Sequence, residues 1–286
     1  MGTTPRHSPL RDAASSEDPA ADGRPDPSTP APLPGDDPEL FSLDLAGLAR
    51  RWAAAMARPP MSAEAMTGAD RRAQAFGVPG MRLMEQAGTA VAAAVRALAV
   101  EQGRLDSGPI VVLAGPGNNG GDGFVAARRL AAAGATVIVA LVASEGRPTG
   151  PDAGRNWDRL DRVARVQRLH TPVARDVATF GQGIERAAVI VDALLGTGVR
   201  GVLRDPIRAA VEVANRARSA RVPIVAVDTP TAVDLTSGEP SDPVVRADLT
   251  VTFHRPKLGL LSAHGRALAG RVLVAPIGIP PEADRA

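Results

Sequence analysis

The stretch Gly115-Pro116-Gly117-Asn118-Asn119-Gly120-Gly121-Asp122-Gly123 decides the fold of this chain. An apolar run over residues 109–114 precedes it, and apolar positions with helical spacing follow over residues 124–130. Strand, glycine loop and helix in this order suit a phosphate group, because glycines let backbone N–H groups approach a ligand and a helix N-terminus carries partial positive charge. The first expected ligand class is therefore a nucleotide or another phosphorylated molecule.

The same stretch also has a purely structural interpretation. The pattern Gly115-x-Gly117-x-x-Gly120 matches the dinucleotide fingerprint, but similar turns occur wherever a strand and a helix pack closely. The residues between the glycines favour a binding site, because two Asn and an Asp supply oxygens that a plain turn does not need. Such oxygens suit a group I or group II cation as well as sugar hydroxyls.

Length and composition exclude several classes of protein. The chain has 286 residues, of which 44% are hydrophobic, enough for one large core. The net charge of +2 comes without a basic block, so no nucleic-acid partner is expected. The absence of Cys excludes disulfides and thiolate sites, and the absence of Tyr argues against Tyr-dependent dehydrogenases. We find no secretory leader and no run near the roughly 18 to 20 apolar residues of a membrane span, so we expect a cytoplasmic protein without membrane contact.

The chain divides into three parts by composition. Residues 1–38 are rich in Pro and Ala and predict a disordered tail. Residues 39–60 carry apolar positions at helical spacing and predict an amphipathic helical extension that packs on the domain or on a partner subunit. Residues 61–286 are expected to form the globular domain, beginning with helices over 62–77 and 80–99.

The globular part alternates apolar, β-branched runs with helical patterns. This alternation predicts an α/β fold of three layers: a doubly wound, mostly parallel sheet with helices on both faces. The predicted strands are 109–114, 136–143, 163–169, 187–195, 223–227, 249–253 and 270–277.

Polar or glycine-rich loops follow several of these strands. Asp192 lies within one strand, which continues into a second glycine loop at Gly196; Asp228 follows another strand, and Lys257 follows the next. Each of these features also has a purely structural explanation: a buried carboxylate, a plain turn, a helix cap or a solvated lysine. The carboxyl ends of parallel strands meet at one edge, however, and so many unusual loops at that edge favour a ligand site.

These motifs together resemble a known family. The glycine stretch, with Asp192-Ala193-Leu194-Leu195-Gly196-Thr197-Gly198, Asp228-Thr229-Pro230, Pro256-Lys257-Leu258-Gly259, Ile277-Gly278-Ile279-Pro280 and Leu83-Met84-Glu85, is similar to the NAD(P)H-hydrate epimerase family, the YjeF N-terminal domain type. The resemblance implies a Rossmann-like homodimer that interconverts the R and S epimers of hydrated NADH and NADPH, which bear a hydroxyl at C6 of the nicotinamide ring. It further implies a bound potassium ion and a separate NAD(P)H-hydrate dehydratase as functional partner.

The resemblance also implies roles for individual residues. Asp228 is expected to be the catalytic acid and base, with electrostatic help from Lys257. Potassium is expected at Asn119, Asp192 and Thr231. The expected substrate contacts are Asn118, Asn119, Gly120, Gly121, Asp122, Gly196, Thr197, Gly198, Val199, Arg200, Gly201, Val202 and Asp228.

Departures from the family pattern keep alternatives open. Thr231-Ala232 stands where the family has Ser-Gly, and a Gly at such a turn often has positive φ, which costs a residue with a Cβ roughly 1 kcal/mol or more. Gln86 also replaces an Asn of the family pattern. A weakly active or inactive nucleotide- or protein-binding module is therefore the first alternative. An NAD-dependent dehydrogenase, with Glu145 as a ribose-binding acid, is the second.

Overall fold

A seven-stranded parallel sheet forms the centre of the protein. The computed structural model describes residues 1–2, 31–196 and 202–285. The strand order is β3-β2-β1-β4-β5-β6-β7, and every neighbouring pair is parallel. Each predicted strand is confirmed: β1 (Ile110–Ala114), β2 (Val137–Leu141), β3 (Val166–His170), β4 (Val189–Ala193), β5 (Ile224–Val227), β6 (Leu249–Phe253) and β7 (Arg271–Ala275).

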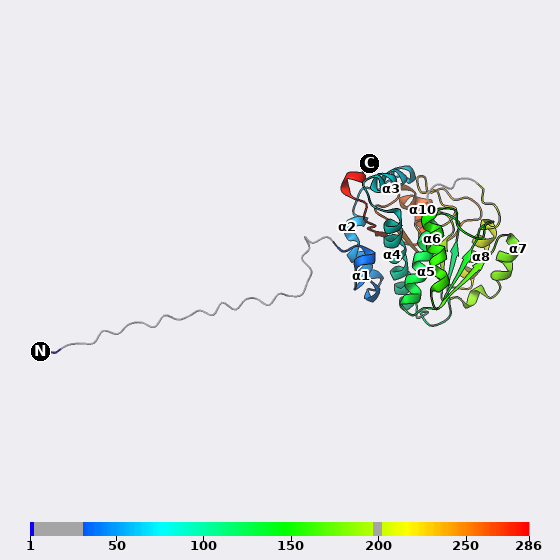
Figure 1. The fold of residues 1–286 in the computed structure, drawn as a ribbon, viewed down its shortest axis with the longest axis horizontal. Helices are drawn as coiled ribbons and strands as arrows, with labels where there is room; N and C mark the ends of the chain where they lie inside the picture. The colour runs from blue at the N-terminus through cyan, green and yellow to red at the C-terminus, as the bar shows by residue number, and fades with distance from the viewer. Residues whose placement is uncertain (3–30, 197–201, 286) are drawn as a thin grey trace. The chain divides into compact units, whose positions relative to one another are not determined.

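Helices cover both faces of this sheet, as Figure 1 shows. Alternate residues of β1 join two different hydrophobic clusters: Ile110 and Val112 pack in the cluster that holds α4 and α5, whereas Val111 and Leu113 pack in the cluster that holds α7 and α8. This two-sided burial explains why the strands read as continuous apolar runs. The helices concerned are α4 (Gly80–Glu101), α5 (Asn118–Ala132), α6 (Pro151–Arg159), α7 (Ala174–Phe180) and α8 (Ile207–Ser219).

Most of the remaining elements lie before the first strand or after the sixth. They are η1 (Pro34–Asp36), η2 (Leu40–Ser42), α1 (Leu45–Arg51), α2 (Ala53–Met56), α3 (Ala63–Ala75), η3 (Leu160–Arg162), η4 (Ile184–Arg186), α9 (Leu258–Leu261), α10 (Ala263–Ala269) and η5 (Pro281–Ala283). Two of these, η3 and η4, are single turns that flank β3 and β4.

The chain reverses its direction of winding at β1. From β1 it proceeds through β2 to β3 on one side, and then returns to place β4 on the other side. The crevice outside the carboxyl ends of β1 and β4 is therefore the switch point at which doubly wound sheets bind ligands.

The segment predicted as one amphipathic helix over 39–60 is divided in the structure. Helix α1 begins after Asp44, whose Oδ1 accepts a hydrogen bond from the Gly47 amide, and it ends at Trp52. Trp52 is buried, and the short helix α2 follows it. The prediction of a single helix was wrong because the backbone leaves helical dihedral angles at Trp52 (φ −104°, ψ 13°), a local change that the apolar spacing does not reveal.

Gln86 fixes the segment that leads into this region. Its buried side chain accepts a hydrogen bond from the Gly35 amide and donates one to Asp36 Oδ2 at 3.2 Å, so it holds η1 against α4. Most of the predicted tail of residues 1–38 lies outside the described residues, but residues 34–36 belong to the packed domain.

Helix α4 is long, apolar and mostly buried. By length and composition it could cross a membrane, but 83% of the relevant window is buried inside the protein. Helix α5, the sheet, α1, η1 and η2 all pack against it, so its apolar surface is explained as part of the core.

Candidate active site at the switch point

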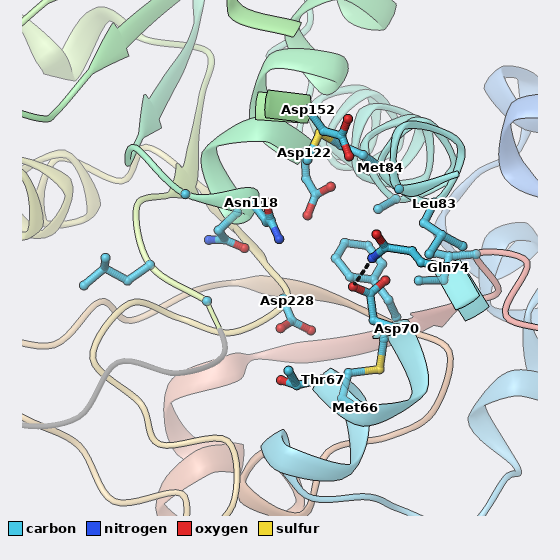
Figure 2. Close-up of a pocket in the computed structure, with 18 of the residues that line it drawn as sticks. Met66, Thr67, Asp70, Gln74, Leu83, Met84, Asn118, Asp122, Asp152 and Asp228 are labelled. Carbon is cyan, nitrogen blue, oxygen red and sulfur yellow. Dashed lines mark hydrogen bonds between the residues drawn. The ribbon is translucent and has the colours of Figure 1, made fainter. Parts of the chain in front are cut away.

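A cavity of about 470 Å³ lies at the carboxyl edge of the sheet. Figure 2 shows side chains from α3, α4, α5 and the end of β5 surrounding it. The lining residues are Met66, Thr67, Asp70, Gln74, Gly80, Leu83, Met84, Ala87, Pro116, Gly117, Asn118, Asn119, Asp122, Asp152, Leu194, Leu195, Gly196, Asp228, Phe253 and Ile277.

The glycine stretch has a different local structure from the predicted loop. Helix α5 already begins at Asn118, with Gly117 as its N-cap, so the loop prediction was wrong for residues 118–123. The glycines of this helix serve close packing: a Cβ on Gly120 would lie 1.9 Å from the Gly115 carbonyl oxygen, and one on Gly123 would lie 2.7 Å from Ala193 Cβ. None of them needs positive φ.

This early helix start determines which groups face the cavity. A Cβ on Gly117 would meet nothing within 4 Å, so the helix N-terminus has open space in front of it. Asn118 and Asp122 project from the first turns of α5 into the cavity (Figure 2). The arrangement suits an anionic ligand beside free backbone N–H groups.

Asp228 lies at the end of β5 and lines the cavity. Its backbone has φ 61°, in the left-handed region, and its amide donates to the Val251 carbonyl at 2.8 Å. Its Oδ1 accepts a hydrogen bond of 2.8 Å from Thr252 Oγ1. A non-glycine residue held at positive φ by its neighbours is the kind of strain that gathers at functional sites.

Lys257 supports Asp228 from within the protein. It is fully buried and is not among the lining residues, and its Nζ lies 3.8 Å from Asp228 Oδ1. Nζ donates to Thr252 Oγ1 at 3.1 Å and to the carbonyls of Phe253 and Arg255 at 2.7 and 3.0 Å. Burial lowers the pKa of Lys257, and the negative charge of Asp228 opposes that shift.

Asp192 forms a second buried group next to this edge. Its Oδ1 accepts from Thr231 Oγ1 at 2.7 Å and from the Leu194 amide at 3.3 Å, and its Oδ2 accepts from the Thr231 amide at 2.7 Å. Burial raises the pKa of Asp192 to about 6 despite these hydrogen bonds. Neither Asp192 nor Thr231 lines the cavity.

The Asn119 side chain lies close to the loop that follows Asp192. A Cβ on Gly196 would lie 3.0 Å from Asn119 Oδ1, so a larger residue there would press on the Asn119 side chain. Asn119 Nδ2 is buried and has no hydrogen-bond partner in the described part of the chain. A buried amide left without a partner needs an explanation, since such groups are nearly always satisfied.

Four carboxyl groups line the cavity, and two of them were missed by the sequence analysis. Asp70 and Asp152 come from α3 and α6 and join Asp122 and Asp228 around the cavity. Burial raises the pKa of Asp70, and it raises the pKa of Asp122 well above the usual range with further contributions from the charges of Asp228 and Asp70. The spacing of Met66, Asp70 and Gln74 marks one face of a helix, but it does not say what that face meets.

Some predicted site residues do not take part in the cavity. Residues 197–201 lie outside the described residues, and Val202 is 84% exposed. Gly120 and Gly121 pack against protein atoms and not against the cavity. His254, which lies close to Lys257 in the sequence, is not among the lining residues and contacts Arg58 and Asp284.

The fold and this cavity define a doubly wound α/β domain with a ligand site at its switch point. The sequence profile of the family described as YjeF-related protein N-terminus matches residues 80–259. The chain belongs to this family.

Named relatives support the same family assignment. A bifunctional NAD(P)H-hydrate repair enzyme Nnr of Pyrobaculum aerophilum is 44% identical over 217 residues, which are 76% of this chain and 41% of the relative. An NAD(P)H-hydrate epimerase of Cenarchaeum symbiosum is 37% identical over 79% of this chain and 98% of the relative. The crystal structure of the yeast protein YNL200c matches with a TM-score of 0.61 and 26% identity, over 71% of this chain and 83% of the yeast chain. The chain thus spans less than half the length of the bifunctional relative.

Proposed function

We propose that this protein is an NAD(P)H-hydrate epimerase, which interconverts the R and S epimers of hydrated NADH and NADPH. The observation that carries the proposal is Asp228, a carboxyl group held by Thr252 and Lys257 at the wall of the switch-point cavity. The relative from Cenarchaeum symbiosum, nearly all of whose length this chain covers, bears that name.

The chemistry of the substrate suits such a carboxyl group. The hydrated ring is a hemiaminal whose N1 lone pair can expel the C6 hydroxyl, and the departing oxygen needs a proton. Asp228 transfers protons to and from this oxygen as acid and base. Lys257 acts as a positioning residue, because its Nζ contacts the same Thr252 hydroxyl that donates to Asp228.

The N-terminus of α5 provides the anchor for the phosphates in this proposal. Gly117 leaves open space before the first turn, and Asn118 offers its amide beside it. The pyrophosphate would lie at these backbone N–H groups, with the nicotinamide end directed toward the carboxyl groups.

Potassium is the proposed cofactor. The donor set fits the ion, because Asp192 supplies a carboxylate, Thr231 a hydroxyl and Asn119 an amide oxygen, all hard oxygen donors. The orphaned Asn119 amide group supports the assignment, since rotating it by half a turn would replace an unpaired donor with an oxygen. The ion would supply a fixed positive charge next to Asp192, whose burial otherwise penalises its ionised form.

Two proposed partners complete the assignment. An NAD(P)H-hydrate dehydratase would consume the S epimer, and the bifunctional names of several relatives support this pairing. The protein is further proposed to form a homodimer, which sedimentation at micromolar concentration tests. A single monomeric species at all concentrations contradicts the dimer.

An epimerisation assay tests the function directly. The R epimer of hydrated NADH is supplied, and the appearance of the S epimer is followed by chromatography with wild-type protein, Asp228→Asn and the exposed control Asp106→Asn. We expect acceleration by the wild type and the control, and its loss in Asp228→Asn. A folded wild-type protein that binds NADH but gives only the spontaneous rate contradicts the proposal. That result favours the binding-module alternative, to which the strained Ala232 at φ 77° already points.

A further inference from the structure

Asp122 and Asp228 face each other across the cavity from different parts of the fold. Asp122 projects from α5 and Asp228 from the end of β5, and both line the cavity; in Figure 2 the Asp122 carboxyl lies above Asp228 and points toward it. Their environments differ. Asp228 is held by Thr252 and lies near Lys257, whereas the Asp122 carboxyl has no hydrogen bond or ion pair with any residue that the structure describes.

The proposed reaction needs proton transfer on both faces of the nicotinamide ring. When the C6 hydroxyl leaves, C6 becomes planar, and the other epimer forms only if oxygen returns on the opposite face. One carboxyl group fixed on one side cannot reach both oxygens. Inverting glycosidases solve the same geometrical problem with two carboxyl groups, one on each side of the reacting carbon.

We propose that Asp122 is a second catalytic acid and base, working on the face of the ring opposite to Asp228. The inference rests on the proposed epimerase function and assigns a role that Asp228 alone does not fill. It makes the cavity a two-sided site, with water as the second reactant.

The conversion proceeds through loss and return of water at C6. One carboxylic acid gives its proton to the C6 hydroxyl, the C6–O bond breaks, water leaves, and the N1 lone pair forms the N1=C6 double bond. A water molecule on the other face then forms the new C6–O bond and gives a proton to the second carboxylate, while the N1=C6 electrons return to N1. One proton has crossed from one Asp to the other, and exchange with solvent resets the pair.

The electrostatics of the two groups suit this division of labour. Burial raises the pKa of Asp122, and the charges of Asp228 and Asp70 raise it further, so Asp122 is the group that holds a proton. Asp228 has a different neighbour, because the buried ammonium group of Lys257 lies 3.8 Å from its Oδ1. Two carboxyl groups whose environments push their protonation apart are the mark of an acid and base pair.

An oxygen label tests the inference apart from the function itself. The R epimer is prepared with heavy oxygen in the C6 hydroxyl and converted in ordinary water, and the label in the S epimer is measured by mass spectrometry against a protein-free control. We expect each catalysed conversion to lose the label. Retained label during accelerated conversion overturns the proposal and points to opening and closing of the ring.

Variants of Asp122 provide the second test. Asp122→Asn should lose at least about 100-fold in the catalysed rate in both directions, and Asp122→Glu should recover part of it. Asp106→Asn is the matched control, and melting temperature and NADH binding report whether each variant is folded. Full activity in folded Asp122→Asn overturns the inference while the epimerase function stands. If the wild-type protein itself does not accelerate the conversion, the proposed epimerase function is wrong. The two results therefore separate an error in the role of Asp122 from an error in the function.

Discussion

The hydroxyl of Thr252 connects Asp228 to Lys257. Thr252 Oγ1 donates to Asp228 Oδ1 at 2.8 Å and accepts from Lys257 Nζ at 3.1 Å, so the buried cation orients the carboxyl group through an intermediate residue. Lys257 also holds the carbonyls of Phe253 and Arg255. The strand end that carries Asp228 is therefore tied to the loop after β6.

Thr252→Val tests this connection. The change keeps the shape but removes a hydrogen bond to a charged group, which is worth about 1.5–3 kcal/mol. We expect kcat for epimerisation to fall about 10- to 100-fold, with little change in KM, because the hydroxyl touches no substrate. Thr252→Ser should restore most of kcat. A rise in KM alone would mean that Thr252 acts on binding and does not position Asp228.

Asp70→Asn should shift the pH profile. The pKa of Asp122 is raised first by burial and then by the charges of Asp228 and Asp70, so the protonated form persists to higher pH. Activity that needs this proton is lost as pH rises through the raised pKa. Removing the Asp70 charge lowers that pKa, and the alkaline limb of kcat/KM should move to lower pH. Asp152→Asn, whose charge is not among those that raise the pKa of Asp122, is the control; equal shifts in both variants contradict the assignment.

Potassium should protect the protein at neutral pH. The pKa of Asp192 rises from 3.8 when unfolded to about 6 in the fold because of burial, so the folded state binds more protons between these values. Stability therefore falls as pH rises from about 4 to 6, by about 3 kcal/mol from this group. We expect melting temperatures measured in choline chloride to fall across this range and potassium chloride to reverse much of the loss.

The control for that experiment is Asp122→Asn. Burial raises the pKa of Asp122 as well, so part of the loss with pH in the wild type comes from the cavity. In this variant, the difference between the melting temperatures in potassium chloride and in choline chloride should remain. Identical curves in potassium and choline chloride would argue against an ion beside Asp192.

Ala232→Gly should stabilise the protein. Ala232 has φ 77°, which costs a residue with a Cβ about 1 kcal/mol relative to glycine. We expect a rise in melting temperature of roughly 2–4 °C for a domain of this size. Ala209→Gly, within α8, should have the opposite sign because glycine is unfavourable inside a helix. A lower melting temperature for Ala232→Gly would show that the Cβ gains more from packing than it loses in strain.

The strands of the sheet could be predicted from the sequence because a strand buried on both faces appears as a continuous apolar run. All seven apolar runs became strands, and the positive φ that the family pattern implied at Ala232 is present. The start of α5 was missed, since glycines that serve close packing look the same in a sequence as glycines that form a loop.

The site was only partly predictable for the same reason. Asp122 lies within the glycine stretch and Asp228 follows a predicted strand, and both positions mark the ligand-binding edge of a doubly wound sheet. Asp70 lies on a helix whose cavity-facing side is decided by tertiary packing, and Thr252 lies in a strand where Thr is an ordinary choice. Lys257 was expected to help Asp228 electrostatically, and its full burial could not be read from the sequence, because it depends on the oxygens of Thr252, Phe253 and Arg255 that meet its Nζ in the fold.

The docking of α3 sets the order in which the cavity can appear during synthesis. This helix supplies one wall, yet it is held by residues made much later: the Met61 amide donates to the Pro256 carbonyl at 2.9 Å, and Arg72 Nε donates to the Ala283 carbonyl at 2.8 Å. A nascent chain that has emerged only as far as α8 already carries the N-terminal end of α5 but lacks the residues that fix α3 opposite it. The cavity therefore gains its last wall only when the final residues of the domain have been made and have folded back onto α3.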